Sequence, residues 1–293
     1  MAETIFRAGA MHGQAAAGTP STEGRVTMAV EPTEQARGPW DPRALHGGAP
    51  AALFAAAFER AEPGSDLRVA RLGFEFLRPI PLAPLQLSTR IVRPGRRVQE
   101  LAGELTATDP RSGAEQLVCR ASALRVQPIG AAVADAAIAA SGDGAAGAGE
   151  RPLPAPETGT AVRFSLNDSQ ESSFAATAME MRWLDDPRTR GPARVWMRLR
   201  HELLAGEQLT PLARLAATAD FGNGVGAALP FERFLFINAD LTIHLQRQPH
   251  GEWIGLDART LLDSGGTGLA ESVLHDIHGP VGRAFQTLVV EPR

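Results

Sequence analysis

Two stretches of the chain have the continuous apolar character of a helix that is covered on all sides. The first follows Gly47-Gly48-Ala49-Pro50 and consists almost wholly of Ala, Leu and Phe as far as Arg60. The second follows Leu209-Thr210-Pro211 and ends at Asp220. A helix without a polar face is normally buried, so each is expected to lie inside a structure that wraps around it.

Segments in which apolar and polar residues alternate accompany both helices, and this two-residue period is typical of strands with one buried face. In the first half the predicted strands cover residues 26–30, 71–77, 85–92, 98–108 and 114–126. In the second half they cover residues 179–184, 195–200, 234–246, 253–262, 268–275 and 281–290. No helix-sized pattern separates consecutive strands, which argues against a parallel, doubly wound fold.

The order of these elements indicates that one module occurs twice. When the two helices are aligned on Pro50 and Pro211, Glu59 falls opposite Asp220. The sequence therefore predicts an α+β protein of two tandem units, each a long helix wrapped by a curled antiparallel sheet. The expected domains are a flexible tail (1–24), an N-terminal unit (25–127), an Ala/Gly/Pro-rich linker (128–160) and a C-terminal unit (161–293).

Composition narrows the possible partners. The 293 residues are 44% hydrophobic, which is enough for two packed cores, and the net charge of -4 provides no basic field for nucleic acid. Cys119 is the single cysteine, so a disulfide or a cysteine-rich metal site is not expected. No apolar stretch approaches the roughly 20 residues that cross a bilayer, and a signal-peptide pattern is missing, so we expect a cytoplasmic protein with no membrane partner.

Short motifs in both halves resemble those of the acyl-CoA thioesterase II-like family, whose members are built as a double hotdog. In the first half they are Leu45-His46-Gly47-Gly48, Phe74-Glu75-Phe76-Leu77-Arg78-Pro79 and Gly95-Arg96-Arg97-Val98. In the second half they are Ala219-Asp220, Ile237-Asn238-Ala239-Asp240 and Phe285-Gln286. The resemblance covers roughly residues 26–127 and 160–291. It implies hydrolysis of acyl-CoA thioesters without a cofactor, and sheet edges in such folds suggest a homodimer or higher homo-oligomer.

The resemblance also implies three catalytic side chains. The family uses an Asp at the end of the second helix, a Thr or similar residue on the next strand and a Gln on the last strand. Asp220 and Gln286 match this pattern, whereas Asn238 stands where Thr is often found. Asn can still donate and accept hydrogen bonds, although its donors are placed differently from a hydroxyl.

Thioester hydrolysis needs an oriented water, a proton acceptor and donors for the carbonyl oxygen that becomes negative. A carboxylate such as Asp220 can deprotonate the water, and the amides of Asn238 and Gln286 can hold it. Residues His46, Gly47 and Gly48 lie at a helix start, where free N–H groups and the positive end of the dipole would bind substrate and its oxyanion. We expect Asp220 to face this helix start from the other unit.

Two other functions remain open at this stage. A hotdog enoyl-CoA hydratase or dehydratase usually needs a histidine paired with an acid, but no histidine lies near Asp220 in sequence and His46 stands at the opposite end of a helix. A non-catalytic acyl-CoA-binding protein is the third possibility. His275 and His278 have the spacing of a metal pair, but the Gly279-Pro280 that follows favours a hairpin turn, so no metal site is expected. A Gly-x-Ser-x-Gly motif is absent, so a serine nucleophile is unsupported.

Overall fold

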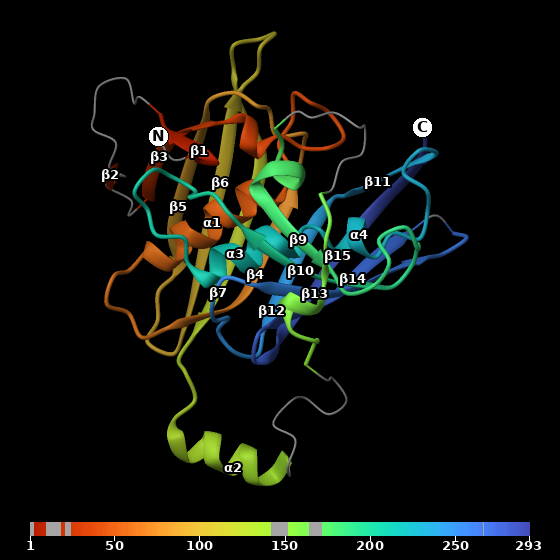
Figure 1. Ribbon diagram of the computed structural model, residues 1–293. Coiled ribbons are helices and arrows are strands. Elements are labelled where there is room, and N and C mark those ends of the chain that lie inside the picture. The colour runs from red at the N-terminus through yellow and green to blue at the C-terminus, as the bar shows by residue number, and fades with distance from the viewer. Residues whose placement is uncertain (1–2, 10–18, 21–24, 142–151, 164–171, 266) are drawn as a thin grey trace.

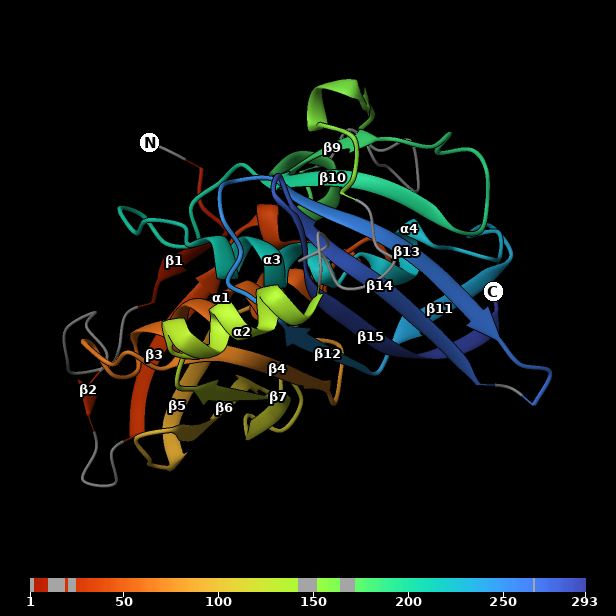
Figure 2. The same cartoon turned by 90° about the horizontal axis from the view of Figure 1, so that it is seen from below.

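Two helices lie side by side at the centre of the molecule, and a curved sheet wraps around them (Figures 1 and 2). They are α1 (Gly48–Arg60) and α3 (Pro211–Ala219). The computed structural model describes residues 3–9, 19–20, 25–141, 152–163, 172–265 and 267–293. Nearly every side chain of α1 is buried, as its lack of a polar face predicts. Thr210 caps α3, because its hydroxyl accepts the N–H of Ala213, and Pro211 occupies the first helical position.

In the described part of the chain, the strands form one antiparallel sheet of 15 strands. Its first half contains, in spatial order, β1 (Phe6–Ala8), β3 (Arg25–Pro32), β5 (Leu85–Arg93), β6 (Val98–Thr108), β7 (Glu115–Val126) and β4 (Arg68–Phe76). Its second half continues with β12 (Asp240–Leu245), β15 (Gly279–Pro292), β14 (Gly268–Asp276), β13 (Ile254–Leu262), β10 (Ala193–Leu199), β9 (Met179–Trp183) and β8 (Thr160–Ala161). Two further strands join at the side, namely β2 (Thr19–Pro20) on β3 and β11 (Phe234–Asn238) on β15.

The two units meet where β4 pairs with β12, with Gly73 opposite Thr242 at the middle of the contact. The neighbouring pairs on either side are Leu72 with Ile243 and Phe74 with Leu241. All four side chains are buried in the core. The sheet therefore continues from one unit into the other, and both helices lie on its inner face (Figure 2). This arrangement confirms the predicted α+β double hotdog fold.

The predicted strand over residues 234–246 is broken at Ala239 into β11 and β12. At the break, the Ala239 N–H donates to the carbonyl of Thr287, and the Ala239 carbonyl accepts the N–H of Phe76. The pattern of alternation does not reveal this break, because both backbone groups of Ala239 still have partners in the sheet. The break lies directly after Asn238, at the end of β11.

The start of the chain differs from the predicted flexible tail over residues 1–24. Ile5 and Phe6 are fully buried, and residues 6–8 form β1. The N–H groups of Ile5 and Phe6 donate to the carbonyls of Glu202 and Leu203 at 2.9 and 2.8 Å. On its other side β1 pairs with β3, so this segment connects the first unit with the second. Residues 1–2, 10–18 and 21–24 of the predicted tail lie outside the described residues.

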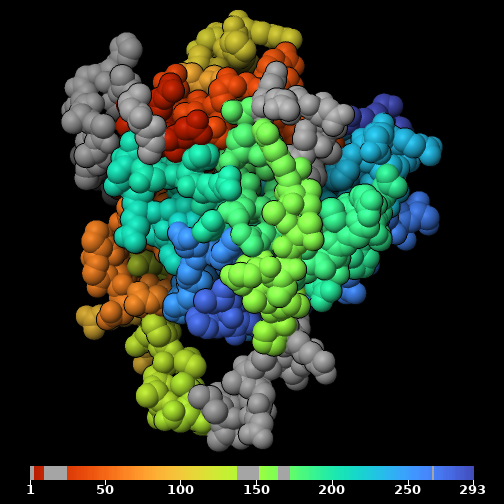
Figure 3. Space-filling view, in the orientation of Figure 1, coloured from red at the N-terminus to blue at the C-terminus, as the bar shows by residue number. Residues whose placement is uncertain are grey.

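The predicted linker over residues 128–160 contains a helix, α2 (Ala131–Ser141), that projects from the body of the molecule (Figures 1 and 3). The end of the predicted linker packs on the second unit. The Trp196 indole donates to the carbonyl of Pro154 at 2.7 Å, and Pro156 is buried. Residues 142–151 lie outside the described residues, and the domain boundaries stay a prediction. Within the described part of the chain, no helix is long and apolar enough to cross a membrane.

Candidate active site

Helices α1 and α3 run in opposite directions, so each helix ends beside the start of the other. Glu59 near the end of α1 accepts a hydrogen bond from the hydroxyl of Thr210 at the start of α3. At the other end of the pair, Asp220 closes α3 and lies beside His46, which precedes α1. The carboxylate of Asp220 is buried, with 4% of the residue exposed. The structure therefore places this acid at a helix start of the other unit.

Gly47 allows the close contact between Asp220 and the start of α1. A Cβ atom on Gly47 would lie 2.8 Å from Oδ2 and 3.0 Å from Oδ1 of Asp220, and 3.0 Å from the ring of Phe76. These distances are shorter than ordinary contacts of a methyl group, so only glycine fits without displacing the carboxylate. The structure thus brings the predicted residues Gly47 and Asp220 together.

The two predicted carboxamides also reach Asp220. The Asn238 side-chain N–H donates to Asp220 Oδ1 at 2.9 Å. The Gln286 Nε2 group donates to the Asp220 carbonyl at 3.2 Å and lies 3.5 Å from Oδ1. Gln286 comes from an inward-facing position of β15 and is 1% exposed. An acid from the end of α3 is therefore surrounded by amide donors from two strands.

His46 packs against two aromatic rings, Phe174 and Phe221, whose own centroids are 6.1 Å apart. Its ring stacks on Phe221 with centroids 4.2 Å apart, and Phe174 lies on it at 5.1 Å. The Nδ1 atom is 3.0 Å from Asp220 Oδ2 and also 3.0 Å from the backbone nitrogen of Gly48. Sequence separation misleads here, because the antiparallel helices bring the histidine and the acid into contact. No histidine lies near Asp220 in the sequence, but His46 is its neighbour in the fold.

Comparisons with known proteins agree with this architecture. Residues 36–126 match the acyl-CoA thioesterase N-terminal domain, and residues 147–290 match the acyl-CoA thioesterase C-terminal domain. The chain belongs to the acyl-CoA thioesterase II-like family. The resemblance found in the sequence is therefore confirmed at the level of the family. No curated protein matches this thioesterase-family chain.

Several solved structures share the fold of this protein at low sequence identity. A protein from Novosphingobium aromaticivorans, provisionally described as a thioesterase, is 20% identical with a TM-score of 0.68, covering 94% of this chain and 98% of its own. The acyl-CoA thioesterase II TesB2 from Mycobacterium marinum is 14% identical with a TM-score of 0.59, covering 92% of each chain. The dehydratase domain of the CurJ module of curacin polyketide synthase is 10% identical with a TM-score of 0.51, covering 94% of this chain and 95% of its own.

Asn223 also belongs to the candidate site, although the sequence analysis does not predict it. The Asn223 N–H donates to Gln286 Oε1 at 2.9 Å, and its side chain donates to the Phe236 carbonyl at 3.2 Å. Asn223 lies in α4 (Gly222–Val225), a single turn formed by the glycine-rich run after Asp220. Glycines after a helix indicate only that the helix ends there. Nothing in the sequence of this run distinguishes an asparagine that binds Gln286 from one that faces solvent.

Cys119 is unsuited to act as a nucleophile in this protein. Burial raises the pKa of its thiol far above the ordinary value, and the negative charges of Asp220 and Glu75 raise it further. A thiol that stays protonated is a poor nucleophile. Among the described residues, no group of three or more His, Cys, Asp or Glu side chains could hold a metal ion.

The opposite end of the helix pair holds the counterpart of Asp220. Burial raises the pKa of the Glu59 carboxyl, although its bond with Thr210 acts in the other direction. A cavity of about 160 Å³ adjoins it. The nearby carboxamide of Gln99 binds Glu62 and Arg125 instead, at 2.9 Å each. Glu59 therefore meets a hydroxyl where Asp220 meets two amides.

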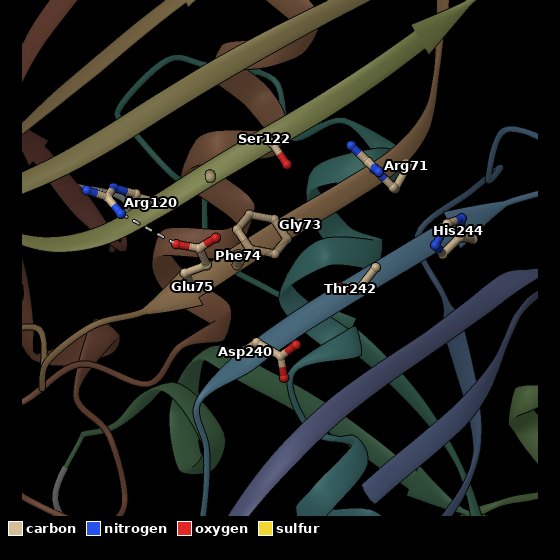
Figure 4. A pocket seen from close by; sticks show the side chains of 10 residues that line it. Arg71, Gly73, Phe74, Glu75, Arg120, Ser122, Asp240, Thr242 and His244 are labelled. Atoms are coloured by element: carbon tan, nitrogen blue, oxygen red, sulfur yellow. Dashed lines mark ion pairs between the residues drawn. The ribbon is translucent and has the colours of Figure 1, made fainter.

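A second hollow, of about 400 Å³, lies on the outer face of the sheet along β4, β7 and β12 (Figure 4). Arg71, Gly73 and Glu75 line it, and they alternate with the buried Leu72 and Phe74. Figure 4 shows Glu75, Asp240 and Arg120 toward one end and Arg71 and His244 toward the other. This groove is separated from the Asp220 carboxylate by the sheet itself.

Proposed function

We propose that this protein hydrolyses acyl-CoA thioesters to a free acid and CoA, with a water molecule activated by Asp220. The observation that carries the proposal is the buried carboxylate of Asp220, bonded to Asn238 and close to Gln286, at the start of α1. Membership of a thioesterase family supports the class of reaction. The cytoplasmic location and the homo-oligomer stay predictions from the sequence.

In the proposed reaction, Asp220 accepts a proton from water as the water oxygen adds to the thioester carbon. Asn238 and Gln286 hold the carboxylate and the water in place without adding a charge. The positive end of the α1 dipole, beside Gly47, stabilises the negative charge on the carbonyl oxygen. The C–S bond then breaks, and the proton passes from Asp220 to the departing thiolate.

The arrangement of donors around Asp220 fits this role. Both carboxamides donate to it, so it is held as an acceptor with a fixed orientation. Gly47 provides the space for the carboxylate beside the positive end of the α1 dipole. A carboxylate that is oriented before the substrate binds needs little rearrangement during the reaction.

The test uses a set of acyl-CoA substrates of increasing chain length, with a thiol-reactive dye to detect free CoA. Asp220→Asn should lower kcat by about 10²-fold or more, because it removes the proton acceptor while preserving the shape. Glu59→Gln, the matching change at the other end of the helix pair, should leave the rate close to that of the wild type. Near-normal turnover in Asp220→Asn, with both variants folded, would refute the proposal.

A second candidate, hydration or dehydration of an enoyl thioester, is favoured by the 3.0 Å contact between His46 Nδ1 and Asp220 Oδ2. A histidine paired with an acid is the arrangement that this reaction usually requires. Enoyl-CoA substrates distinguish the two functions, because hydration removes the enoyl absorbance without releasing a thiol. Hydrolysis releases the thiol and leaves the double bond intact. Binding of acyl-CoA with neither change would favour a non-catalytic acyl-CoA-binding protein.

A further inference from the structure

Gln286 has only one orientation that satisfies its neighbours. The Asn223 N–H at 2.9 Å can only donate, so the side-chain oxygen of Gln286 must face it. The NH₂ group of Gln286 is consequently directed at Asp220, where the carbonyl and Oδ1 both accept. The orientation of this carboxamide therefore depends on the position of one backbone N–H group in α4.

Helix α4 connects Asp220 with the strands that carry the two carboxamides. It begins two residues after Asp220, and the Asn223 N–H donates to Gln286. The Asn223 side chain donates to the Phe236 carbonyl of β11, the strand that ends at Asn238. Asn223 is 7% exposed, so water competes little for these bonds. Figure 1 shows α4 beside β11 and β15. A small shift of α4 would therefore move Gln286 relative to Asp220.

Gly222, the first residue of α4, lies against the oxygen of Gln286. A Cβ atom at this position would be 2.8 Å from Gln286 Oε1 and 2.6 Å from Ser272 Oγ. The residue lies in a helical turn and is not among the glycines with a positive φ angle, so the backbone conformation does not require glycine. Gly224, in the same turn, has nothing within 4 Å of its Cβ position.

We propose that Gly222 is a positioning residue, whose missing side chain lets the Asn223 N–H reach Gln286 and so fixes the carboxamide on Asp220. The serine at the same place can rotate its hydroxyl away from a new methyl group. Gln286 cannot, because both ends of its carboxamide are bonded. A methyl group on Gly222 therefore displaces the carboxamide. This inference rests on the proposed hydrolysis only in its kinetic consequence.

The kinetic test compares Gly222→Ala with Gly224→Ala, two identical changes within one turn of helix. Gly222→Ala should lower kcat by about 10²-fold, since a shift of about 1 Å in a catalytic group can have that effect. Its KM should change by no more than about twofold, because Gln286 acts on water and not on the acyl chain. Gly224→Ala should behave as the wild type. Equal kcat values for the two variants would overturn the proposal.

Removing the serine hydroxyl separates packing from positioning. In the double variant Gly222→Ala/Ser272→Ala, the contact with Ser272 is relieved while the contact with Gln286 stays. The thermal midpoint should recover, but kcat should remain low. Recovery of kcat together with stability would overturn the proposal, because the loss would then come from crowding at Ser272.

A spectroscopic readout keeps the inference independent of the enzymatic activity. The side-chain NH₂ signals of Gln286 can be recorded on protein labelled with ¹⁵N-glutamine and assigned by their loss in Gln286→Glu. Gly222→Ala should shift these signals and Gly224→Ala should not; unchanged signals in Gly222→Ala would overturn the inference. If the wild-type protein hydrolyses no acyl-CoA, the proposed function fails while the NMR comparison still decides whether Gly222 positions Gln286.

Discussion

The Nδ1 atom of His46 lies 3.0 Å from Oδ2 of Asp220, and this contact joins the first unit of the protein to the second. At the other end of the helix pair, Asp220 has an acidic counterpart in Glu59, but His46 has no histidine counterpart among the residues that the structure describes. There, Glu59 meets Thr210, a hydroxyl that caps the neighbouring helix. The two ends of one duplicated arrangement have thus become chemically different.

The variant His46→Phe should distinguish the packing role of the His46 ring from the role of its Nδ1 atom. Phenylalanine can keep the ring contacts with Phe174 and Phe221, but it removes the Nδ1 contact with Asp220 and leaves the Gly48 N–H without its acceptor. We expect kcat for CoA release to fall by about 10²-fold, in the range of a lost acid–base partner. The free energy of unfolding should fall by about 1–3 kcal/mol, because a buried donor loses its partner. Steady-state kinetics and a thermal melt check this. An unchanged kcat would show that the nitrogen serves only the local fold.

Gly47→Ala should damage the site directly. The new methyl group would lie 2.8 Å from Asp220 Oδ2, so either the carboxylate or the start of α1 must move. We expect thioester hydrolysis to fall by about 10²-fold and the free energy of unfolding to decrease by about 1–3 kcal/mol, as for other overpacked sites. Gly130→Ala is the matched control, because nothing lies within 4 Å of its Cβ position. Equal rates in the two variants would contradict this account of Gly47.

Glu59→Gln should change how stability depends on pH. Burial raises the pKa of Glu59 above its value in the unfolded chain, so the folded protein binds the proton more tightly. The contribution of this group to stability is complete below its unfolded pKa and is lost as the pH rises through the raised folded pKa. Glutamine has no charge to bury, so the variant should gain stability relative to wild type on going from mildly acidic to neutral pH. Denaturant titrations across that range test this, and parallel pH profiles would disprove it.

Phe6→Ala should show that the start of the chain is part of the fold. Phe6 is fully buried and its N–H binds the carbonyl of Leu203. Truncation of a buried phenylalanine typically costs about 3–5 kcal/mol. Arg7→Ala, at the exposed neighbouring position, should cost less than about 0.5 kcal/mol. Urea unfolding of the two variants provides the comparison. A small decrease in the free energy of unfolding in both variants would show that this segment does not contribute to the folded core.

The sequence was sufficient for the fold because the relevant signals are local. The apolar run of α1 and the alternation in strands such as β6 and β7 each identify an element within a dozen residues. The sequence does not predict β1, because a strand of three residues is too short to show a two-residue alternation. The break at Ala239 escaped notice because its hydrogen bonds go to distant strands.

The candidate site was predicted only in part for a similar reason. Asp220, Asn238 and Gln286 were selected by their match to short family motifs, and the structure brings them within hydrogen-bonding distance. The contact of His46 with Asp220 depends on the direction in which two helices pack, which no local pattern contains. Asn223 acts on Gln286 through its backbone, so its side-chain type carried no signal.

The pairing of β4 with β12 has a consequence for each half of the protein when it is produced alone. Each half supplies the neighbour that completes the other's sheet, and a fragment ending at Gln127 would present β4 as an open, hydrogen-bonding edge. Such an edge invites association with any strand available, including that of another fragment. Because the acid belongs to one half and the histidine to the other, the contact between Asp220 and His46 exists only when both halves are present.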